Sequence, residues 1–206
     1  MSKRPRANSS QSPSVESTNE ALLADRKIIV AVTGGIASYK AATLVSRLVQ
    51  SGATVRVIMT ESATQFVAPL TFQALSGQSV LTSIWQADDR PDSQHIGLAR
   101  WCDLMVIAPA TADILAKIAC GLTDDLVSLT VSALPRHPQP TPVFIAPSMN
   151  TQMWENPVTQ RNLSTINDLL GYRFIGPGTG WQACRTSGSG RMAEPEEIFA
   201  AVRKAL

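Results

Sequence analysis

The sequence is poor in aromatic residues, which make up 5% of its 206 residues, and it has only three cysteines. Cys102, Cys120 and Cys184 are odd in number and form no C-x-x-C pair, which argues against a disulfide framework and a structural zinc site. No apolar run reaches the roughly 18 residues that a membrane-spanning helix needs. The net charge is only +2, and the basic residues are dispersed along the chain, so the sequence does not indicate a nucleic-acid-binding patch. A hydrophobic content of 44% indicates instead a globular chain with a substantial core.

The first residues lack the apolar segment of a secretory signal and are rich in Ser, Pro, Asn and Gln. Such a composition buries too little surface to offset the entropy lost on ordering. We therefore expect residues 1–24 to form a disordered polar tail and residues 25–206 to form one domain. The "KRPR" run at residues 3–6 is at most a weak nuclear-import patch, and the cysteine pattern favours a reducing compartment, the cytoplasm.

Past the tail, apolar β-branched runs alternate with segments of helical periodicity. Predicted strands separated by helices of this length indicate βαβ units and a parallel sheet. The strands are continuous apolar runs, as expected when both faces of a sheet are covered. The sequence therefore predicts a single-domain α/β fold, a doubly wound (Rossmann- or flavodoxin-like) open parallel sheet with helices on both faces. The expected strands are 27–33, 54–60, 104–110, 142–147 and 172–175; the main helices are 37–48, 111–122, 123–134, 158–170 and 195–206.

Small and hydroxylated residues follow each of the first four predicted strands. These segments read TGGIASYK at 33–40, TES at 60–62, APATAD at 108–113 and APSMN at 146–150. In doubly wound sheets, ligands bind beyond the carboxyl ends of the strands, where backbone N–H groups and helix N-termini favour anions. Neither G-x-G-x-x-G nor the Walker pattern is present, so a mononucleotide phosphate fits this edge better than a dinucleotide or a nucleoside triphosphate.

The segment PSMNTQMW at residues 147–154 resembles the P-x-M-N-x-x-M-W signature of the homo-oligomeric flavin-containing cysteine decarboxylases. The glycine pair at 34–35, His95 and the segment ACRTSGSGRMAEP at 183–195 follow in the order of that family. The similarity spans about residues 26 to 203 and is greatest with the phosphopantothenoylcysteine decarboxylases of coenzyme A biosynthesis. The segment at 146–157, which contains this motif, reads as a Pro-bounded loop, neither a good helix nor a good strand.

The resemblance implies an FMN-dependent oxidative decarboxylation of 4′-phosphopantothenoylcysteine to 4′-phosphopantetheine. FMN would oxidise the cysteinyl thiol, the adjacent carboxylate would leave as carbon dioxide, and the reduced flavin would return a hydride to the product. The protein would supply position, protons and charge. The resemblance also implies a homo-oligomer, usually a trimer, with the flavin between subunits, and no metal or membrane.

The resemblance assigns cofactor-binding roles to residues that follow the first four strands. Two of them depart from the family pattern: Asp113 replaces a common asparagine, and Ser148 replaces a common alanine. A carboxylate at 113 is compatible with ribityl hydroxyls but unfavourable beside the flavin phosphate. The assigned residues are Gly34, Gly35, Ile36, Ser38, Thr60, Ser62, Thr111, Ala112, Asp113, Ser148 and Met149.

By the same resemblance His95, Asn150 and Cys184 are catalytic. Imidazole titrates near neutral pH and suits proton handling, and an uncharged amide at Asn150 can hold a carboxylate while letting it depart. A cysteine thiol is mostly protonated at neutral pH, so Cys184 is better suited to proton donation than to attack. Arg100 and Arg185, together with Asn150, are the candidate substrate-binding residues, and glycine rather than arginine is common after this cysteine.

Four other functions remain open at this level. The same fold serves flavin prenyltransferases and decarboxylases of peptide C-terminal cysteines, although the cysteine-bearing flap at 183–195 argues against both. A non-catalytic homologue that regulates protein phosphatases is a third possibility, in which the tail would bind a partner. A Rossmann-type pyridine-nucleotide oxidoreductase is disfavoured by the missing third glycine.

Overall fold

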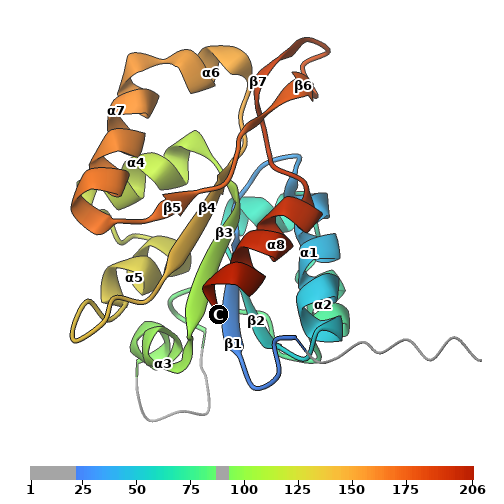
Figure 1. Cartoon of the computed structure of the whole chain (residues 1–206), viewed down its shortest axis with the longest axis vertical. Helices are drawn as coiled ribbons and strands as arrows, with labels where there is room; N and C mark the ends of the chain where they lie inside the picture. Colours follow the sequence, from blue (N-terminus) through green and yellow to red (C-terminus); the bar gives the residue numbers. More distant parts are fainter. Residues whose placement is uncertain (1–21, 87–92) are drawn as a thin grey trace, which may run out of the picture.

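The computed structural model describes residues 22–86 and 93–206 (Figure 1). Most of the predicted tail, residues 1–21, lies outside the described residues. Leu23, however, is buried in the core, 1% exposed, and its N–H donates to the carbonyl of Ser51. The packed domain therefore includes Leu23, two residues before the boundary expected at residue 25.

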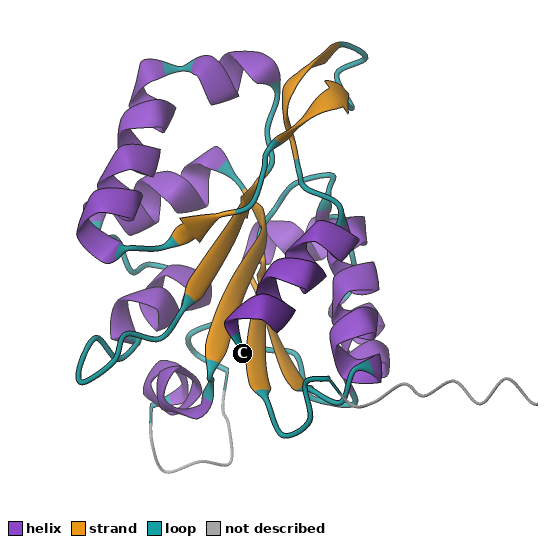
Figure 2. Ribbon diagram, in the orientation of Figure 1, coloured by secondary structure: helices purple, strands orange, loops and turns teal. Residues whose placement is uncertain are grey.

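The central sheet has five parallel strands in the order β2-β1-β3-β4-β5 (Figures 1 and 2). The chain passes from β1 outward to β2 and then crosses to β3 on the other side of β1, so the strand order reverses between β1 and β3. This arrangement confirms the predicted doubly wound open sheet. The strands are β1 (Lys27–Val32), β2 (Thr54–Met59), β3 (Leu104–Ala110), β4 (Val143–Pro147) and β5 (Arg173–Phe174).

Helices cover both faces of the sheet (Figure 2). Successive strand residues point to opposite faces; thus Val30 packs with α1, α2 and α8, whereas Ile29 packs with α3, α4, α5 and α7. No helix in the described part of the chain is long and apolar enough to cross a membrane. The helices are α1 (Ser38–Gln50), α2 (Pro69–Ser76), α3 (Gln94–Trp101), α4 (Ala112–Cys120), α5 (Leu126–Ala133), α6 (Thr151–Glu155), α7 (Pro157–Thr165) and α8 (Pro195–Ala205), with a 3-10 turn η1 (Glu61–Gln65) and a π-helical turn η2 (Ile166–Leu170).

Several elements differ from the sequence prediction. The Pro-bounded loop expected at 146–157 contains the short helix α6, because the Asn150 side chain caps it by accepting a hydrogen bond from the Met153 N–H at 2.9 Å. The Gly- and Ser-rich flap forms an antiparallel hairpin of β6 (Gly178–Trp181) and β7 (Ser187–Arg191), which projects beyond the sheet beside α6 (Figure 1). His95 lies in the first turn of α3.

The tips of β1 and β3 are tied together by one hydroxyl group. Thr33, 1% exposed, donates from Oγ1 to the carbonyl of Pro109 at 2.7 Å and accepts from the N–H of Thr111 at 3.1 Å. Thr111 in turn caps α4 by accepting from the N–H of Ile114 at 3.3 Å. This chain of bonds fixes the spacing of the two loops at the point where the strand order reverses.

Candidate functional site

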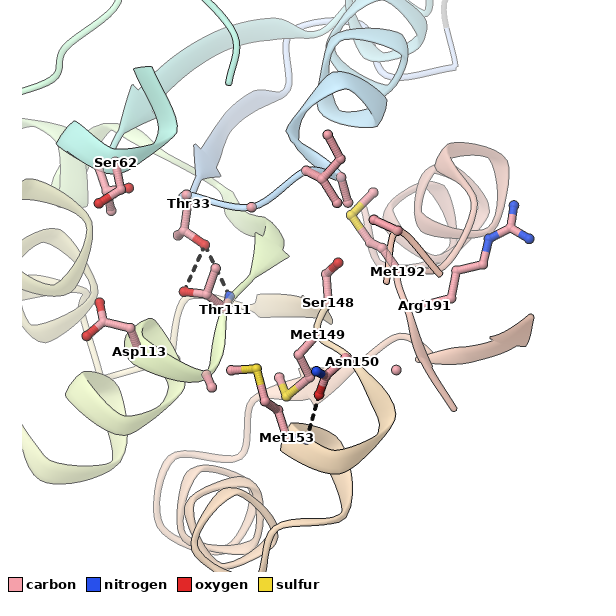
Figure 3. Close-up of a pocket in the computed structure, with 18 of the residues that line it drawn as sticks. Thr33, Ser62, Thr111, Asp113, Ser148, Met149, Asn150, Met153, Arg191 and Met192 are labelled. Atoms are coloured by element: carbon pink, nitrogen blue, oxygen red, sulfur yellow. Dashed lines mark hydrogen bonds between the residues drawn. The ribbon is translucent and has the colours of Figure 1, made fainter. Parts of the chain in front are cut away.

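A cleft of about 880 Å³ opens at the carboxyl edge of the sheet, a volume typical of small-molecule sites. The segments after β1, β2, β3 and β4 all line it, as the sequence predicted from the strand tips (Figure 3). The hairpin β6-β7 and the N-terminus of α6 form the opposite wall. The predicted residues that line the cleft are Gly34, Gly35, Ile36, Thr60, Ser62, Thr111, Ala112, Asp113, Ser148, Met149, Asn150 and Cys184.

The floor of the cleft is exposed backbone. A Cβ atom added at Gly34 would lie 2.4 Å from Ser62 Cβ, so only glycine lets the loops after β1 and β2 approach this closely. Helices α1 and α4 begin at this floor, and the first backbone N–H groups of a helix lack intrahelical acceptors. The floor therefore offers N–H donors and two helix N-termini to an anionic ligand.

One wall of the cleft is acidic but anchored by a lysine. Lys117 Nζ lies 2.9 Å from Asp125, 3.1 Å from Asp124 and 3.6 Å from Asp113. Burial opposes the ammonium charge, but the hydrogen bonds to Asp125 and Asp124 and the charge of Asp113 outweigh it, and they raise the pKa of Lys117. The hydrogen bond from Lys117 also lowers the pKa of Asp124. The carboxylate of Asp113 thus has a cationic partner in the wall of the cleft (Figure 3).

The orientation of the Asn150 amide follows from its capping bond. Its Oδ1 is occupied by the N–H of Met153, as Figure 3 shows, so the amide nitrogen is the atom that remains to donate elsewhere. Among the residues that the structure describes, none accepts a hydrogen bond from that nitrogen. Asn150 therefore presents an uncharged donor to the cleft at the N-terminus of α6.

Cys184 lies at the tip of the β6-β7 hairpin and lines the same cleft. Its Sγ is 3.0 Å from the Thr186 hydroxyl and 3.5 Å from Gln182 Oε1. The adjacent Arg185 has φ 64°, a left-handed conformation that glycine adopts without strain. The hairpin brings the thiol and the Asn150 amide to one cavity, as the sequence predicted.

Four predicted site residues are not among the described residues that line the cleft: Ser38, His95, Arg100 and Arg185. Ser38 is fully buried and its hydroxyl donates to the backbone carbonyls of Thr33 and Gly35, so it holds the loop instead of facing the cavity. His95 and Arg100 lie on α3, at the amino-terminal edge of the sheet and away from the cleft (Figure 1). Arg185 is exposed on the hairpin.

Other lining residues had no sequence signal of their own. Lys117, Trp181 and Gln182 line the cleft; Lys117 lies in the helix expected at 111–122, whereas Trp181 and Gln182 precede the flap at 183–195 and belong to no motif. Lys40 also lines it and bonds Glu194 at 2.8 Å, and Glu194 also binds Arg191 at 2.7 Å. This ion-pair group joins α1 to the base of the hairpin.

The chain matches the family model described as "Flavoprotein" over residues 16–206. It is 45% identical over 183 residues to the coenzyme A biosynthesis bifunctional protein CoaBC of Bacillus subtilis, a match that covers 89% of this chain and 44% of that protein. The chain thus spans less than half the length of this curated relative.

Solved structures of other proteins are also similar to this chain. A mutant PPC decarboxylase complexed with pantothenoylaminoethenethiol superposes with a TM-score of 0.76 at 35% identity, covering 88% of this chain and 98% of that one. The FMN binding protein AtHal3 superposes with a TM-score of 0.74 at 35% identity, covering 88% of this chain and 96% of that one.

The ion pair at the hairpin base makes a prediction about acid stability. The hydrogen bond from Lys40 lowers the pKa of Glu194 from its ordinary 4.5. A carboxyl group with a depressed folded pKa stabilises the fold above its unfolded pKa, and this contribution is lost as pH falls through the folded value. We expect Glu194→Gln, which keeps a capping oxygen, to lower the free energy of unfolding at pH 7, and this deficit to shrink below about pH 4.5.

Urea unfolding of both proteins across a pH series measures this difference. Glu196→Gln is the matched control, because Glu196 is exposed in the same first turn of α8. A Glu194→Gln deficit that stays constant from neutral to acid pH would show that the ion pair does not stabilise the fold.

Proposed function

Since the chain belongs to the flavoprotein family, we propose that it catalyses the FMN-dependent decarboxylation of 4′-phosphopantothenoylcysteine to 4′-phosphopantetheine in coenzyme A biosynthesis. The observation that carries the proposal is the meeting of four strand tips, the Asn150 amide and the Cys184 thiol in one cleft. The resemblance of this chain to a PPC decarboxylase along nearly the whole length of that chain supports it. The proposal concerns decarboxylation alone, not the other activity of the bifunctional relatives.

The residues at the floor of the cleft suit a flavin mononucleotide. The close approach of Gly34 to Ser62 and the N-terminus of α1 offer backbone donors to a phosphate. Thr60, Thr111 and Ser148 add hydroxyl groups beside the cavity. Bound FMN would supply the two-electron acceptor that the substrate thiol needs, and it would return those electrons to the product.

Asn150 would hold the substrate carboxylate. Its oxygen is fixed by the α6 cap, so its nitrogen can donate to a carboxylate without adding charge. A lysine or arginine in its place would stabilise the charged ground state more than the transition state, in which that charge disappears as carbon dioxide. The neutral amide therefore orients the leaving group without opposing its departure.

Cys184 would return a proton to the product. Its thiol lies on the hairpin that forms one wall of the cleft, beside the hydroxyl of Thr186. A protonated thiol is a suitable donor to the carbon that has lost carbon dioxide. The hairpin would also exclude water from the cavity while the substrate is bound.

The position of α3 supports a homo-oligomer, which we propose to be a trimer. Helix α3 carries His95 and Arg100 at the edge of the sheet opposite the cleft (Figure 1). These two side chains would serve the reaction only if a second copy placed its α3 against the cleft of the first. His95 would then handle protons, and Arg100 would face the substrate phosphate; Arg185, exposed beside Cys184, is a second candidate for that phosphate.

We place the reaction in a reducing compartment, the cytoplasm. All three cysteines, which lie in the described part of the chain, are unpaired, as is usual for proteins of reducing compartments. The basic run at residues 3–6, considered above for nuclear import, lies outside the described residues.

The proposed function predicts a yellow protein that releases carbon dioxide from 4′-phosphopantothenoylcysteine. Flavin absorbance of the purified protein and ¹⁴CO₂ release from carboxyl-labelled substrate measure the two properties. The same preparation should neither prenylate FMN nor decarboxylate a peptide ending in cysteine. If the protein bound FMN but acted only on the peptide, or only on a prenyl donor, the corresponding alternative function would replace the proposed one.

Substitutions at Asn150 separate its charge from its capping role. Aspartate is an equally good N-cap, so Asn150→Asp should fold and bind FMN like the wild type. Its carboxylate would repel that of the substrate, and we expect kcat/KM to fall by at least about 100-fold. Asn150→Ala should also lose turnover, and it should lose about 1 kcal/mol of stability because α6 loses its cap. Near-normal turnover by Asn150→Asp would remove Asn150 from carboxylate binding.

Cys184→Ser tests the proton donor. Serine keeps the size of the side chain but is a far weaker acid than cysteine. We therefore expect normal FMN binding, and we expect the amount of carbon dioxide released to exceed the amount of 4′-phosphopantetheine formed. The measurement is the ratio of carbon dioxide to 4′-phosphopantetheine in a single turnover. Mass spectrometry then identifies the accumulated species, the decarboxylated thiol that is still oxidised because it has not been protonated. Cys120→Ser is the control, since this cysteine is exposed at the end of α4, outside the cleft. An unchanged ratio in Cys184→Ser would exclude Cys184 as the donor.

A further inference from the structure

The β6-β7 hairpin is mostly exposed, yet it holds one buried polar side chain. Gln182 is 7% exposed, whereas its neighbours Trp181 and Ala183 are exposed. A buried amide is favourable only when its donors and acceptor are satisfied. Both ends of the Gln182 amide have partners, and these partners lie on three different segments.

The nitrogen of the amide binds its own hairpin. Nε2 of Gln182 donates to the carbonyl of Ser189 at 2.7 Å and, more weakly, to that of Gly188 at 3.4 Å. These bonds join the two strands across the turn that carries Cys184. The backbone adds a bond from the N–H of Gln182 to the carbonyl of Thr186 at 2.8 Å.

The oxygen of the amide reaches α6 and the thiol. Oε1 of Gln182 accepts from the N–H of Thr151 at 3.2 Å and from Cys184 Sγ at 3.5 Å, and the Thr151 hydroxyl oxygen lies 3.4 Å from it. Thr151 is the first residue of α6, directly after its cap, Asn150. One carbonyl oxygen therefore connects Cys184 to Thr151, the residue that follows Asn150.

The packing between the hairpin and α6 is close enough to need glycine. A Cβ atom at Gly188 would overlap the Thr151 hydroxyl, and one at Gly190 would overlap the carbonyl of Met149. Thr151 Oγ1 also donates to the carbonyl of Ser189 at 2.9 Å, and the N–H of Met149 donates to that of Gly190 at 2.9 Å. Strand β7 thus packs against the segment 149–151, and Gln182 takes part in the same contact.

We propose that Gln182 is a positioning residue that locks the hairpin onto the N-terminus of α6 and so sets the distance between the Cys184 thiol and the Asn150 amide. The inference rests on the proposed function for its catalytic consequence but not for its structural one. Gln182 would not itself exchange protons or electrons with the substrate. Its loss would let the hairpin move away from α6 and carry the thiol with it.

The reactivity of the Cys184 thiol reports this movement independently of catalysis. In a Cys120→Ser background the other thiol, Cys102, is 8% exposed, and burial raises its pKa to about 12, so iodoacetamide should modify Cys184 alone. We expect Gln182→Leu to increase the rate of Cys184 alkylation several-fold, because the thiol loses its acceptor, the amide oxygen of Gln182. In the otherwise unmodified chain, Gln182→Leu should retain FMN and lower kcat by about 10- to 100-fold, since small misplacements of catalytic groups have effects of this size.

Variants on the other side of the contact provide the matched tests. Thr151→Val removes the hydroxyl and should give a weaker form of the Gln182→Leu phenotype, whereas Thr151→Ser keeps the hydroxyl and should resemble the wild type. Thr179→Val, which removes an exposed hydroxyl from the same hairpin, should change neither rate. A Gln182→Leu protein with wild-type alkylation and kcat would overturn the proposal, as would equal effects of Thr151→Ser and Thr151→Val.

The outcomes also separate this inference from the proposed function. If the wild-type chain released no carbon dioxide, the function would fail while the alkylation rates still tested the lock. If Gln182→Leu lost turnover with an unchanged alkylation rate, the residue would act on the substrate directly and the positioning role would be wrong.

Discussion

The hydroxyl of Thr33 is the contact on which the cleft depends, because it binds the tips of β1 and β3 where the sheet changes direction. The loop after β1 can then lie against the loop after β2, which the missing side chain of Gly34 permits. The loop after β3 starts α4 through the cap at Thr111. Each of these loops lines the same cavity, and α1 and α4 begin there, so the meeting of the loops and helix N-termini in one cleft is a consequence of strand order.

The sheet and its order of elements could be predicted from the sequence, because strands covered on both faces are continuous apolar runs. Segments whose structure depends on distant contacts could not be predicted in this way. The Gly- and Ser-rich run at 187–191 has little strand propensity, but it pairs with β6 in a hairpin that the bond between Gln182 and Thr151 ties to α6. Helix α6 has five residues, too few for a periodicity signal, and depends on the cap at Asn150.

The residues that line the cleft could be predicted where they directly follow a strand. They could not be predicted where their position depends on tertiary packing. Gly34 and Thr111 line the cleft, whereas the Ser38 hydroxyl, which the resemblance assigned to the cofactor, donates to carbonyls of its own loop. The acidic residue at 113 looked unfavourable beside a phosphate, but Lys117, one helical turn later, offsets part of its charge, although Lys117 also binds Asp124 and Asp125. His95 belongs to the same motif set yet lies on α3, outside the cleft, because the order of motifs along the chain does not say how far apart they lie in space.

The hairpin is attached to the domain at two points of different chemistry, and this difference bears on the proposed reaction. At its base Glu194 binds Lys40 and Arg191, a charged contact that pH and salt weaken. At its tip the contact is the neutral amide of Gln182, and the donor offered to the cleft by Asn150 is neutral as well. A fixed positive charge beside the cavity would stabilise a carboxylate that must leave uncharged. Lys40 and Arg191 also line the cleft, but both bind the carboxylate of Glu194, which offsets part of their positive charge, whereas the donor that Asn150 offers carries no charge.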